Sequence, residues 1–349
     1  MTTELQSILE LTPESLAAWL KEEGEPGYRL RQVLDWVYVR RVGRFEEMAN
    51  LPETLRRRLE AGYLLSSLTE IERLSSKDGS TEKFLFGLSD GEQVECVAMS
   101  ARGRQTFCIS SQAGCPLGCR FCATGSMGFA RNLTAGETLG QVVALARARN
   151  GLGNVVFMGT GEPLLNLEAV FFALESLTDR RRFGISARSI TISTAGITPA
   201  IRQLSEFPVR PHLALSLNSP FDEQRTALMP INRKYPLAQV LRACEHYAAR
   251  TKRSVSLEYV LISGVNTSED AVHALARTAL RLRAKVNLIA FNPVAGCGFR
   301  RPTTQEVSGF RRGLQDRGVV VTQRFRRGVD IGAGCGQLRG KHMVPELER

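Results

Sequence analysis

The sequence predicts an α/β protein in which repeated strand–helix units form a parallel sheet. Three observations predict this fold class: helical periodicity up to about residue 64, short alternating runs over 65–100, and alternating strand-type and helix-type segments from about residue 101 onward. Consecutive strands joined by helices lie parallel, and the helices pack on the sheet. We expect four segments: a helical domain over 1–64, a linker with a β-hairpin over 65–100, a core over 101–336 and a C-terminal tail over 337–349.

The first segment is predicted to be a small helical domain. Thr12 followed by Pro13 marks a helix start, apolar residues recur at near-helical spacing over 29–42, and Pro52 opens a third helix. Basic side chains gather here, at Arg40, Arg41, Arg44, Arg56, Arg57 and Arg58. They indicate either contact with phosphate groups or a solvated charged face, and the sequence does not choose between these.

The second segment changes to short runs with alternating polarity. Residues 81–86 and 93–98 are predicted strands, joined by a turn at Ser89-Asp90-Gly91. An accessory hairpin or small sheet is therefore expected before the core.

The core carries the alternating series. The expected strands are 106–110, 154–158, 189–193, 212–217, 254–261, 286–291 and 319–324, and the expected helices are 134–150, 167–177, 198–204, 237–250, 268–283 and 304–316. Functional residues of such folds lie at the carboxyl ends of the strands.

Composition narrows the class of protein. The 349 residues are 43% hydrophobic and 23% charged, which is ordinary for a globular protein. No apolar run is long enough to span a bilayer and no targeting segment is visible, so we expect a cytoplasmic protein. A net charge of +11 indicates a nucleic-acid binder or a solvated basic surface. Eight cysteines in a reducing compartment indicate metal-bound or redox-active thiols.

The densest motif is Cys115-Pro-Leu-Gly-Cys119-Arg-Phe-Cys122, with three cysteines in eight residues. This spacing lets one loop direct three sulfurs at a common centre, as an iron–sulfur cluster requires. Three thiolates leave one iron of a [4Fe-4S] cluster without a protein ligand, and an open position is where substrate chemistry takes place. A structural zinc site would need a fourth ligand, for which the next candidate is Cys108. We favour the open cluster.

Short polar motifs follow several predicted strands. Gly159-Thr160-Gly161-Glu162 comes after the second strand; its glycines permit close backbone approach, and Glu162 can accept hydrogen bonds from an ammonium group. Further hydroxyl and amide groups stand at later strand ends, namely Ser193, Ser216-Leu217-Asn218 and Asn292. Each alone could be a turn or a helix cap, but together they indicate a pocket for a polar ligand.

These residues together resemble the radical S-adenosylmethionine enzymes and, among them, the RlmN/Cfr family of RNA adenine methyltransferases. The resemblance covers nearly the whole chain. Its most specific stretches are 112–125, 128–134 and 330–338, and Cys108 with Cys335 narrows it from the superfamily to this family. It implies a partial (β/α)6 radical S-adenosylmethionine barrel, open on one side to admit a flipped nucleotide, with the first domain as an RNA-binding accessory.

The resemblance also implies roles for individual residues. Cys115, Cys119 and Cys122 hold the [4Fe-4S] cluster, whose fourth iron chelates S-adenosylmethionine. The residues implied to contact that cofactor are Gly161, Glu162, Ser193, Ser216, Leu217, Asn218 and Asn292. Cys335 is implied to be the cysteine that becomes methylated, Cys108 its disulfide-forming partner, and Glu95 the acid/base carboxylate.

By the same resemblance, the expected reaction is methylation of carbon 2 of adenosine 2503 in 23S ribosomal RNA, and adenosine 37 of transfer RNA is left open as a second target. One S-adenosylmethionine methylates Cys335, and the adenosyl radical from a second activates that methyl group. Cys108 then releases the product by thiol exchange. The implied partners are protein-poor precursor 23S rRNA, transfer RNA and an electron donor such as flavodoxin; the enzyme is expected to be a monomer without membrane contact.

The chain departs from the family pattern at three positions. Asn218 stands where His is common, and Gly332 and Gly334 stand where Asp and Ala are common. Three alternatives stay open: Cfr-type methylation of carbon 8 at the same adenosine, a radical enzyme acting on a protein or small molecule, and a zinc or iron–sulfur nucleic-acid binding protein without activity. A radical enzyme that acts on a protein or small molecule would need neither Cys335 nor the basic first domain.

Overall fold

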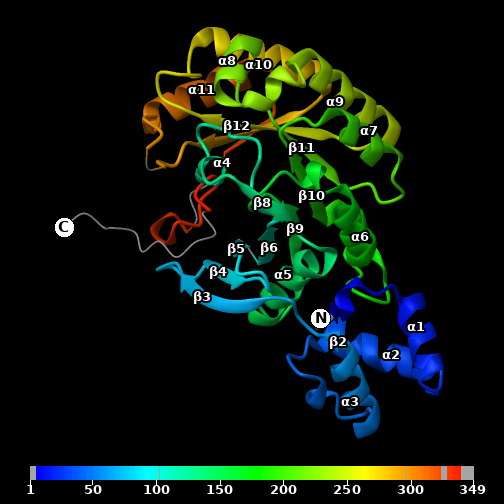
Figure 1. Cartoon of the computed structure of the whole chain (residues 1–349). Helices are drawn as coiled ribbons and strands as arrows, with labels where there is room; N and C mark the ends of the chain where they lie inside the picture. Colours follow the sequence, from blue (N-terminus) through cyan, green and yellow to red (C-terminus); the bar gives the residue numbers. More distant parts are fainter. Residues whose placement is uncertain (1–4, 102, 295, 324–327, 339–349) are drawn as a thin grey trace.

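A ten-stranded mixed sheet forms the centre of the computed structural model, which describes residues 5–101, 103–294, 296–323 and 328–338. The strand order is β14-β13-β12-β11-β10-β9-β6-β5-β4-β3 (Figure 1). Its strands are β3 Thr69–Ser75, β4 Thr81–Gly87, β5 Gln93–Ala101, β6 Arg104–Ile109, β9 Asn154–Phe157, β10 Ile190–Thr194, β11 His212–Ser216, β12 Val255–Leu261, β13 Lys285–Ala290 and β14 Val321–Gln323.

Six strand–helix units build the parallel part of this sheet, from β6 to β13, and β14 adds a short further strand. The main crossover helices are α5 Ala135–Ala148, α6 Leu167–Thr178, α7 Thr198–Glu206, α9 Leu237–Thr251, α10 Glu269–Leu282 and α11 Thr304–Asp316. The parallel order brings the carboxyl ends of seven strands to one edge of the sheet, which is where the sequence predicts the site. The predicted α/β class, with a parallel sheet and its crossover helices, is confirmed.

Local sequence explains where these helices begin. The Thr134 hydroxyl accepts the backbone N–H of Glu137 at 3.1 Å, and the Glu137 carboxylate accepts that of Thr134 at 2.8 Å. Thr303 and Glu306 form the same reciprocal pair at the start of α11. Two otherwise unpaired N–H groups are satisfied at each start, so these helix ends are well defined by the sequence.

The strands before the cysteine loop differ from the expected accessory hairpin. β3, β4 and β5 are antiparallel to one another, and β5 pairs antiparallel with β6, so they continue the main sheet. In this register Val97 of β5 lies opposite Cys108 of β6. The hairpin is therefore a wall of the core, and its residues share a face with the functional site.

The N-terminal domain is helical, as predicted. It contains α1 Pro13–Glu22, α2 Tyr28–Leu34, the π-helical turn η2 Asp35–Arg40 and α3 Glu53–Gly62, with the short elements β1 Gln6–Ser7, η1 Ile8–Glu10, η3 Phe45–Glu47 and β2 Tyr63–Leu64. The Thr12 hydroxyl accepts the N–H of Ser15 at 3.0 Å and Pro13 opens α1, so the helix start is that expected from sequence.

This domain packs directly against the core (Figure 1). The Glu10 carboxylate accepts the N–H of Gly136 in the first turn of α5 at 3.0 Å. The rings of Tyr38 and Phe183 meet edge to face with centroids 5.0 Å apart. A negative side chain at a helix N-terminus is favourable, so the contact stabilises both partners.

Several short elements are absent from the sequence prediction. They are β7 Gln112–Gly114, α4 Ala123–Ser126, β8 Phe129–Asn132, η4 Pro163–Leu165, η5 Ala187–Ser189, α8 Asp222–Leu228, η6 Pro230–Arg233 and η7 Val329–Ile331. Within the described residues, no helix has the length and apolar character to cross a membrane.

Candidate active site

The three clustered cysteines lie on one loop held between two short strands. β7 pairs antiparallel with β8, and the loop from Cys115 to Gly128 connects them. The N–H of Cys115 donates to the Gly128 carbonyl at 2.8 Å, which closes the base of the loop. A Cβ on Gly125 would come within 2.7 Å of the Cys119 carbonyl oxygen, so glycine lets the loop fold tightly behind that cysteine.

Cys115, Cys119 and Cys122 line one cavity of about 170 Å³ at the carboxyl ends of the strands. Burial raises the pKa of Cys115 to about 12 and that of Cys119 well above its ordinary range, and nearby thiols and Glu162 raise both. Ionising such thiols requires nearby positive charge, which iron ions supply because metal ligation stabilises the thiolate. The donor set therefore fits an iron–sulfur cluster.

The structure gives no support to a single-ion site such as structural zinc. Among the described residues, no group of three or more His, Cys, Asp or Glu side chains is placed to hold one metal ion. A tetrahedral zinc ion holds its sulfur ligands at about 2.3 Å, which requires them to converge on one point. The three thiols instead share the wall of a cavity that is larger than one ion.

Glu162 lines the cavity from the segment after β9, where it caps η4. Its side chain is 3% exposed, and its carboxylate accepts the N–H groups of Ala195 at 2.7 Å and Leu164 at 3.1 Å. Burial raises the pKa of Glu162 to about 7, although these donors act in the opposite direction. The structure thus offers a buried carboxylate that a ligand ammonium group would favour in its ionised form.

Gly161 allows Glu162 to reach this position. Its φ is +103°, and a Cβ there would lie 2.6 Å from Cβ of Gln112. The Gln112 side-chain oxygen accepts the N–H of Glu162 at 2.8 Å, which ties the turn to β7. Close backbone approach is therefore the physical reason for glycine at this position, as the sequence predicts.

Ser193, Ser216, Asn218 and Asn292 also line the cysteine cavity, whereas Leu217 is not among its lining residues. Leu217 is 0% exposed, and its N–H donates to the Glu258 carbonyl at 3.0 Å. Side chains alternate direction along a strand, so the residue between Ser216 and Asn218 turns into the core. The structure does not bring the Leu217 side chain into this site.

Asn218 has the left-handed φ of 58° and uses its side chain within the protein. Its side-chain oxygen Oδ1 accepts the N–H of Val260 at 2.9 Å, and its side-chain Nδ2 donates to the Met229 sulfur at 3.3 Å. Asn tolerates left-handed backbone better than most residues, which gives a structural reason for Asn at this position.

Asn292 connects the cysteine cavity to the C-terminal loop. Its amide donates to the Cys335 carbonyl at 3.2 Å. The Asn292 Oδ1 atom is buried and has no hydrogen-bond partner among the residues that the structure describes. A buried acceptor of this kind is expected to receive a ligand donor.

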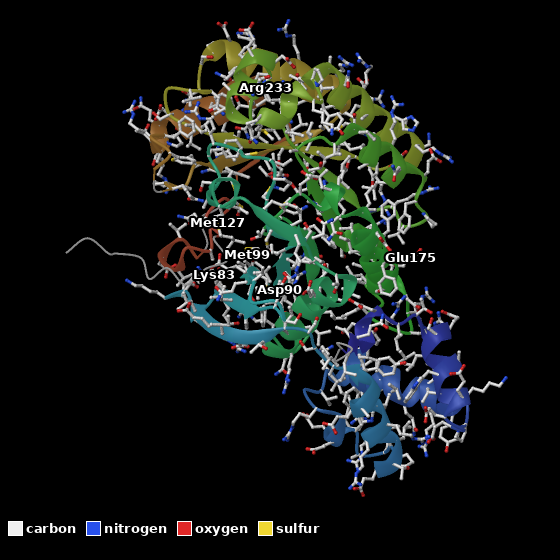
Figure 2. The ribbon with its side chains drawn as sticks, in the orientation of Figure 1. Lys83, Asp90, Met99, Met127, Glu175 and Arg233 are labelled. Carbon is white, nitrogen blue, oxygen red and sulfur yellow. The ribbon has the colours of Figure 1, made fainter. Side chains whose placement is uncertain are left out.

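Cys335 lies where two cavities meet. It lines the cysteine cavity and also a second cavity of about 440 Å³, which Cys108, Met99 and Thr124 line as well. Figure 2 shows Met99 and Lys83 beside the C-terminal loop. The structure therefore brings Cys108 and Cys335, 227 positions apart in the numbering of a chain of 349, to one cavity.

Glu95 lies on the face of β5 that carries Val97, which lines this second cavity. Its carboxylate is 2.8 Å from the Lys83 ammonium, and both side chains are largely buried. Glu95 itself is not among the residues that line either cavity. It is placed next to the second cavity, beside a cation that the sequence analysis did not single out.

Two further residues that the sequence analysis did not single out belong to the site. Thr124 donates its hydroxyl to the Leu338 carbonyl at 2.8 Å, which joins the cysteine loop to the C-terminal loop. Met229 lines the cysteine cavity from the segment after α8. Thr124 directly follows the last cysteine and its neighbour, so its position was a usable signal, but nothing in the sequence marks Met229.

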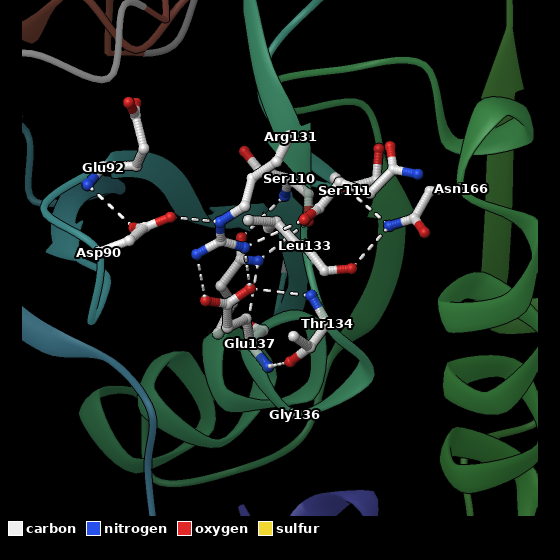
Figure 3. Close-up of polar contacts among 12 residues, drawn as sticks. Asp90, Glu92, Ser110, Ser111, Arg131, Leu133, Thr134, Gly136, Glu137 and Asn166 are labelled. Atoms are coloured by element: carbon white, nitrogen blue, oxygen red, sulfur yellow. Dashed lines mark hydrogen bonds and ion pairs between the residues drawn. The ribbon is translucent and has the colours of Figure 1, made fainter. Parts of the chain in front are cut away.

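Arg131 fixes the exit of the cysteine loop (Figure 3). Its guanidinium donates to both oxygens of Glu137 at 2.8 Å and also to Asp90 in the β4–β5 turn. Bidentate pairs of this geometry are strong and directional. Arg131 therefore joins β8, α5 and the hairpin into one support for the loop.

The basic residues of the N-terminal domain are mostly engaged within that domain. Arg40 pairs with Asp35, Arg57 with Glu53, Arg58 with Glu23 and Glu25, and Arg44 with Glu46 and Glu47, while Arg41 and Arg56 donate to carbonyls of Tyr38 and Glu46. This pattern favours the solvated charged face over a row of open phosphate-binding cations.

Comparison with known proteins identifies both parts of the chain. Residues 109–276 match the Radical SAM superfamily, and residues 6–64 match the "Ribosomal RNA large subunit methyltransferase N-terminal domain". A protein of Gemmatimonas aurantiaca described as "Probable dual-specificity RNA methyltransferase RlmN" is 44% identical over 351 aligned residues, which cover 99% of this chain and 96% of that protein. A "Dual-specificity RNA methyltransferase RlmN" of Geotalea uraniireducens is 42% identical and covers 97% of this chain and 98% of that protein.

A solved structure agrees over the same extent. The crystal structure of a radical SAM methyltransferase from Sphaerobacter thermophilus superposes with a TM-score of 0.94 at 43% identity, covering 96% of this chain and 100% of that one. The similarity therefore includes the N-terminal helices, the hairpin strands and the parallel sheet together.

Proposed function

Because the chain belongs to the RlmN family of radical S-adenosylmethionine RNA methyltransferases, we propose that it methylates carbon 2 of adenosine 2503 in 23S ribosomal RNA, with adenosine 37 of transfer RNA as a second target. The radical S-adenosylmethionine family implies a [4Fe-4S] cluster and S-adenosylmethionine. We assign the cluster to Cys115, Cys119 and Cys122, and the cofactor to the cavity that these three cysteines line.

The observation that carries the proposal is the position of Cys335 on the common wall of two cavities. From the cysteine cavity, its sulfur can accept a methyl group from S-adenosylmethionine. From the larger cavity, the methylated sulfur can meet an extruded adenine, since chemistry on a base requires it to leave the stack. A single thiol that faces both cavities suits a methyl carrier.

The protein's own residues then complete the transfer. Cys115, Cys119 and Cys122 would hold the cluster, which would supply the one-electron chemistry needed to activate the methyl group of Cys335. Glu95 is assigned as the base that takes the ring proton from carbon 2. The Cys108 thiolate attacks the Cys335 sulfur and a disulfide forms. The bond from that sulfur to the transferred carbon breaks, its electron pair goes to the carbon, and the carbon takes up a proton to become the methyl group. An external reductant reopens the disulfide.

Cofactor contacts are assigned in the same way. Glu162 and Gly161 would receive the amino group of S-adenosylmethionine, and the unpartnered Asn292 oxygen would accept from the ligand. Ser193, Ser216 and Asn218 would line its remaining length, and Leu217 would contribute its backbone alone. We further propose a cytoplasmic monomer that acts on protein-poor precursor RNA and draws electrons from a low-potential donor such as flavodoxin.

Anaerobic methylation of an RNA fragment that contains the target adenosine tests this proposal, with mass spectrometry of the modified nucleosides. The wild-type protein should yield 2-methyladenosine. Cys335→Ala should yield no methylated RNA, and Cys108→Ala should retain RNA covalently bound through Cys335, because release fails. Cys297→Ser, which changes a cysteine outside both cavities, serves as the control.

The outcomes separate the alternatives. Formation of 8-methyladenosine in place of 2-methyladenosine would show the carbon-8 reaction. Full activity of Cys335→Ala would exclude the two-cysteine mechanism. Bound zinc without cleavage of S-adenosylmethionine would indicate a binding protein rather than an enzyme.

A further inference from the structure

Arg225 is a buried cation that interacts with Cys119, one of the three clustered cysteines. It stands in α8, is 0% exposed and has the largest fully buried side chain of the described residues. Moving a charge out of water costs several kcal/mol unless opposite charge or hydrogen bonds compensate. Its position therefore needs a physical reason.

Hydrogen bonds satisfy most of the Arg225 guanidinium. The group donates to the carbonyls of Leu217 at 3.1 Å, Ala195 at 2.5 Å and Ser216 at 3.2 Å, and to the side-chain oxygen of Asn232 at 2.6 Å. All of these acceptors are neutral. Within the described ranges, no carboxylate forms an ion pair with Arg225, and Asp222 acts on it only through a longer-range electrostatic interaction.

This charge lies directly behind the cysteine cavity. Ala195 and Ser216, whose carbonyls Arg225 binds, line that cavity together with Cys119. The N–H of Arg120, next to Cys119, donates to the Leu228 carbonyl at the end of α8 at 3.0 Å. The helix that carries Arg225 is thus attached to the cysteine loop itself.

The two sites also interact electrostatically. Burial lowers the pKa of Arg225 to about 10, and the Cys119 thiolate opposes that shift more than Asp222 does. Conversely, Arg225 favours the ionised form of Cys119. A guanidinium with this pKa stays protonated at neutral pH, so a permanent positive charge lies near enough to Cys119 to interact with it.

We propose that Arg225 is a positioning residue whose fixed charge raises the reduction potential of the cluster held by Cys115, Cys119 and Cys122. Net charge near an iron–sulfur cluster sets its potential, and a nearby cation favours the reduced, more negative form. Arg225 also ties the ends of β10 and β11 to α8, so it holds the cavity wall at the same time. The inference depends on the cluster assignment in the proposed function.

Redox titration of the reconstituted holoenzyme, monitored by electron paramagnetic resonance, measures the reduction potential of the cluster. It separates the effect of the Arg225 charge from the structural role of Arg225 in holding the cavity wall. Arg225→Gln removes the charge and keeps part of the hydrogen bonding. Asn232→Asp leaves Arg225 in place and sets a carboxylate against it. Both variants should lower the ratio of reduced to oxidised cluster at a fixed potential about tenfold, which for one electron is about 59 mV. Arg225→Lys keeps the charge and should stay near the wild-type ratio.

A buried arginine elsewhere controls for packing. Arg182 is 7% exposed, donates to the Ser176 hydroxyl at 2.6 Å and lines neither of the two cavities of the site. Arg182→Gln should lower thermal stability without any change in the cluster ratio. If Arg225→Gln does not fold, Asn232→Asp alone decides, because it retains the arginine.

Two negative results are distinguishable. A wild-type protein that assembles no cluster after reconstitution would overturn the proposed function and this inference with it. A normal wild-type cluster whose ratio is unchanged in Asn232→Asp and in any folded Arg225→Gln would overturn the role of Arg225 alone.

Discussion

At the scale of single residues, Glu162 shows how burial prepares a group for its ligand. Its carboxyl is buried among backbone donors, and burial raises its pKa to about 7 in the ligand-free protein. The folded state therefore binds this proton more tightly than the unfolded state does. The stabilisation is complete below the unfolded pKa near 4.5 and is lost as pH rises through about 7.

Glu162→Gln should remove this pH dependence. Between pH 4.5 and 7.5 the ligand-free wild-type protein should lose about 3 kcal/mol of stability relative to the variant, because each pKa unit corresponds to about 1.4 kcal/mol. Urea denaturation at several pH values measures the difference. The exposed Glu168→Gln should run parallel to wild type, and parallel curves for Glu162→Gln would contradict the burial argument.

Gly161 makes a second prediction at this scale. Gly161→Ala should destabilise the fold by about 3 kcal/mol, because a Cβ combines strained backbone with a contact of 2.6 Å to Gln112. Gly24→Ala is the control: Gly24 also has a positive φ, of +75°, but a Cβ added there would have no atom within 4 Å. It should cost only about 1 kcal/mol. Equal losses in chemical denaturation would show that the backbone angle alone matters.

At the scale of elements, Arg131 is predicted to hold the cysteine loop in place. Arg131→Lys should cost about 2 kcal/mol, because lysine cannot pair in bidentate fashion with Glu137 while it also reaches Asp90. Hydrogen exchange should speed up in β7 and β8. Arg73→Lys is the matched control: its bidentate partner Glu70 is exposed, so the loss should stay below about 0.5 kcal/mol. Similar losses of stability in the two variants would argue against a role of Arg131 in holding the cysteine loop.

The elements that could be predicted have local signals. The helices after Thr134 and Thr303 begin with reciprocal caps, and the parallel strands alternate regularly with helices. α8 could not be predicted because it is short and its buried central residue is Arg225. A buried arginine does not contribute to the apolar stripe by which a helix is recognised in a sequence. β5 and β6 pair as consecutive strands separated by two residues, and Gly103 with its φ of +74° is a local turn signal; the shorter expected strands, 93–98 and 106–110, left this turn unrecognised.

The candidate site was predictable to a similar degree. Strand-end polar residues and the cysteine motif indicate one pocket, and most of them line the same cavity. The inward turn of Leu217 depends on strand register, which sequence alone does not define. Lys83 and Glu95 lie on the two strands of the predicted hairpin, but their pairing depends on strand register. Arg225 comes from a helix distant in sequence from Cys119, so only the fold could show their proximity.

At the scale of the whole molecule, the N-terminal domain packs so tightly on the core that it leaves no room for a side chain at Gly136. Ala normally stabilises a helix relative to Gly by about 1 kcal/mol. Here a Cβ would lie 2.7 Å from Cβ of Ser7 and 2.8 Å from the Glu10 carboxylate, so Gly136→Ala should instead loosen the domain junction.

Limited proteolysis after residue 64, together with thermal denaturation, measures this effect. Gly309→Ala is the control, since Gly309 stands inside α11 and nothing lies within 4 Å of its added Cβ. That variant should gain up to about 1 kcal/mol. A gain of stability in both variants would mean that the domain junction accommodates the added Cβ of Gly136→Ala without losing stability.

The open sheet has a consequence for how copies of the protein behave towards one another. Its last strand, β3, ends the order of ten and carries Glu70, Glu72 and Arg73, with a register shift between the two glutamates. An unpaired strand edge is a template for pairing with another chain, and charges and bulges on that edge oppose such pairing. β3 therefore protects the open sheet against edge-to-edge aggregation.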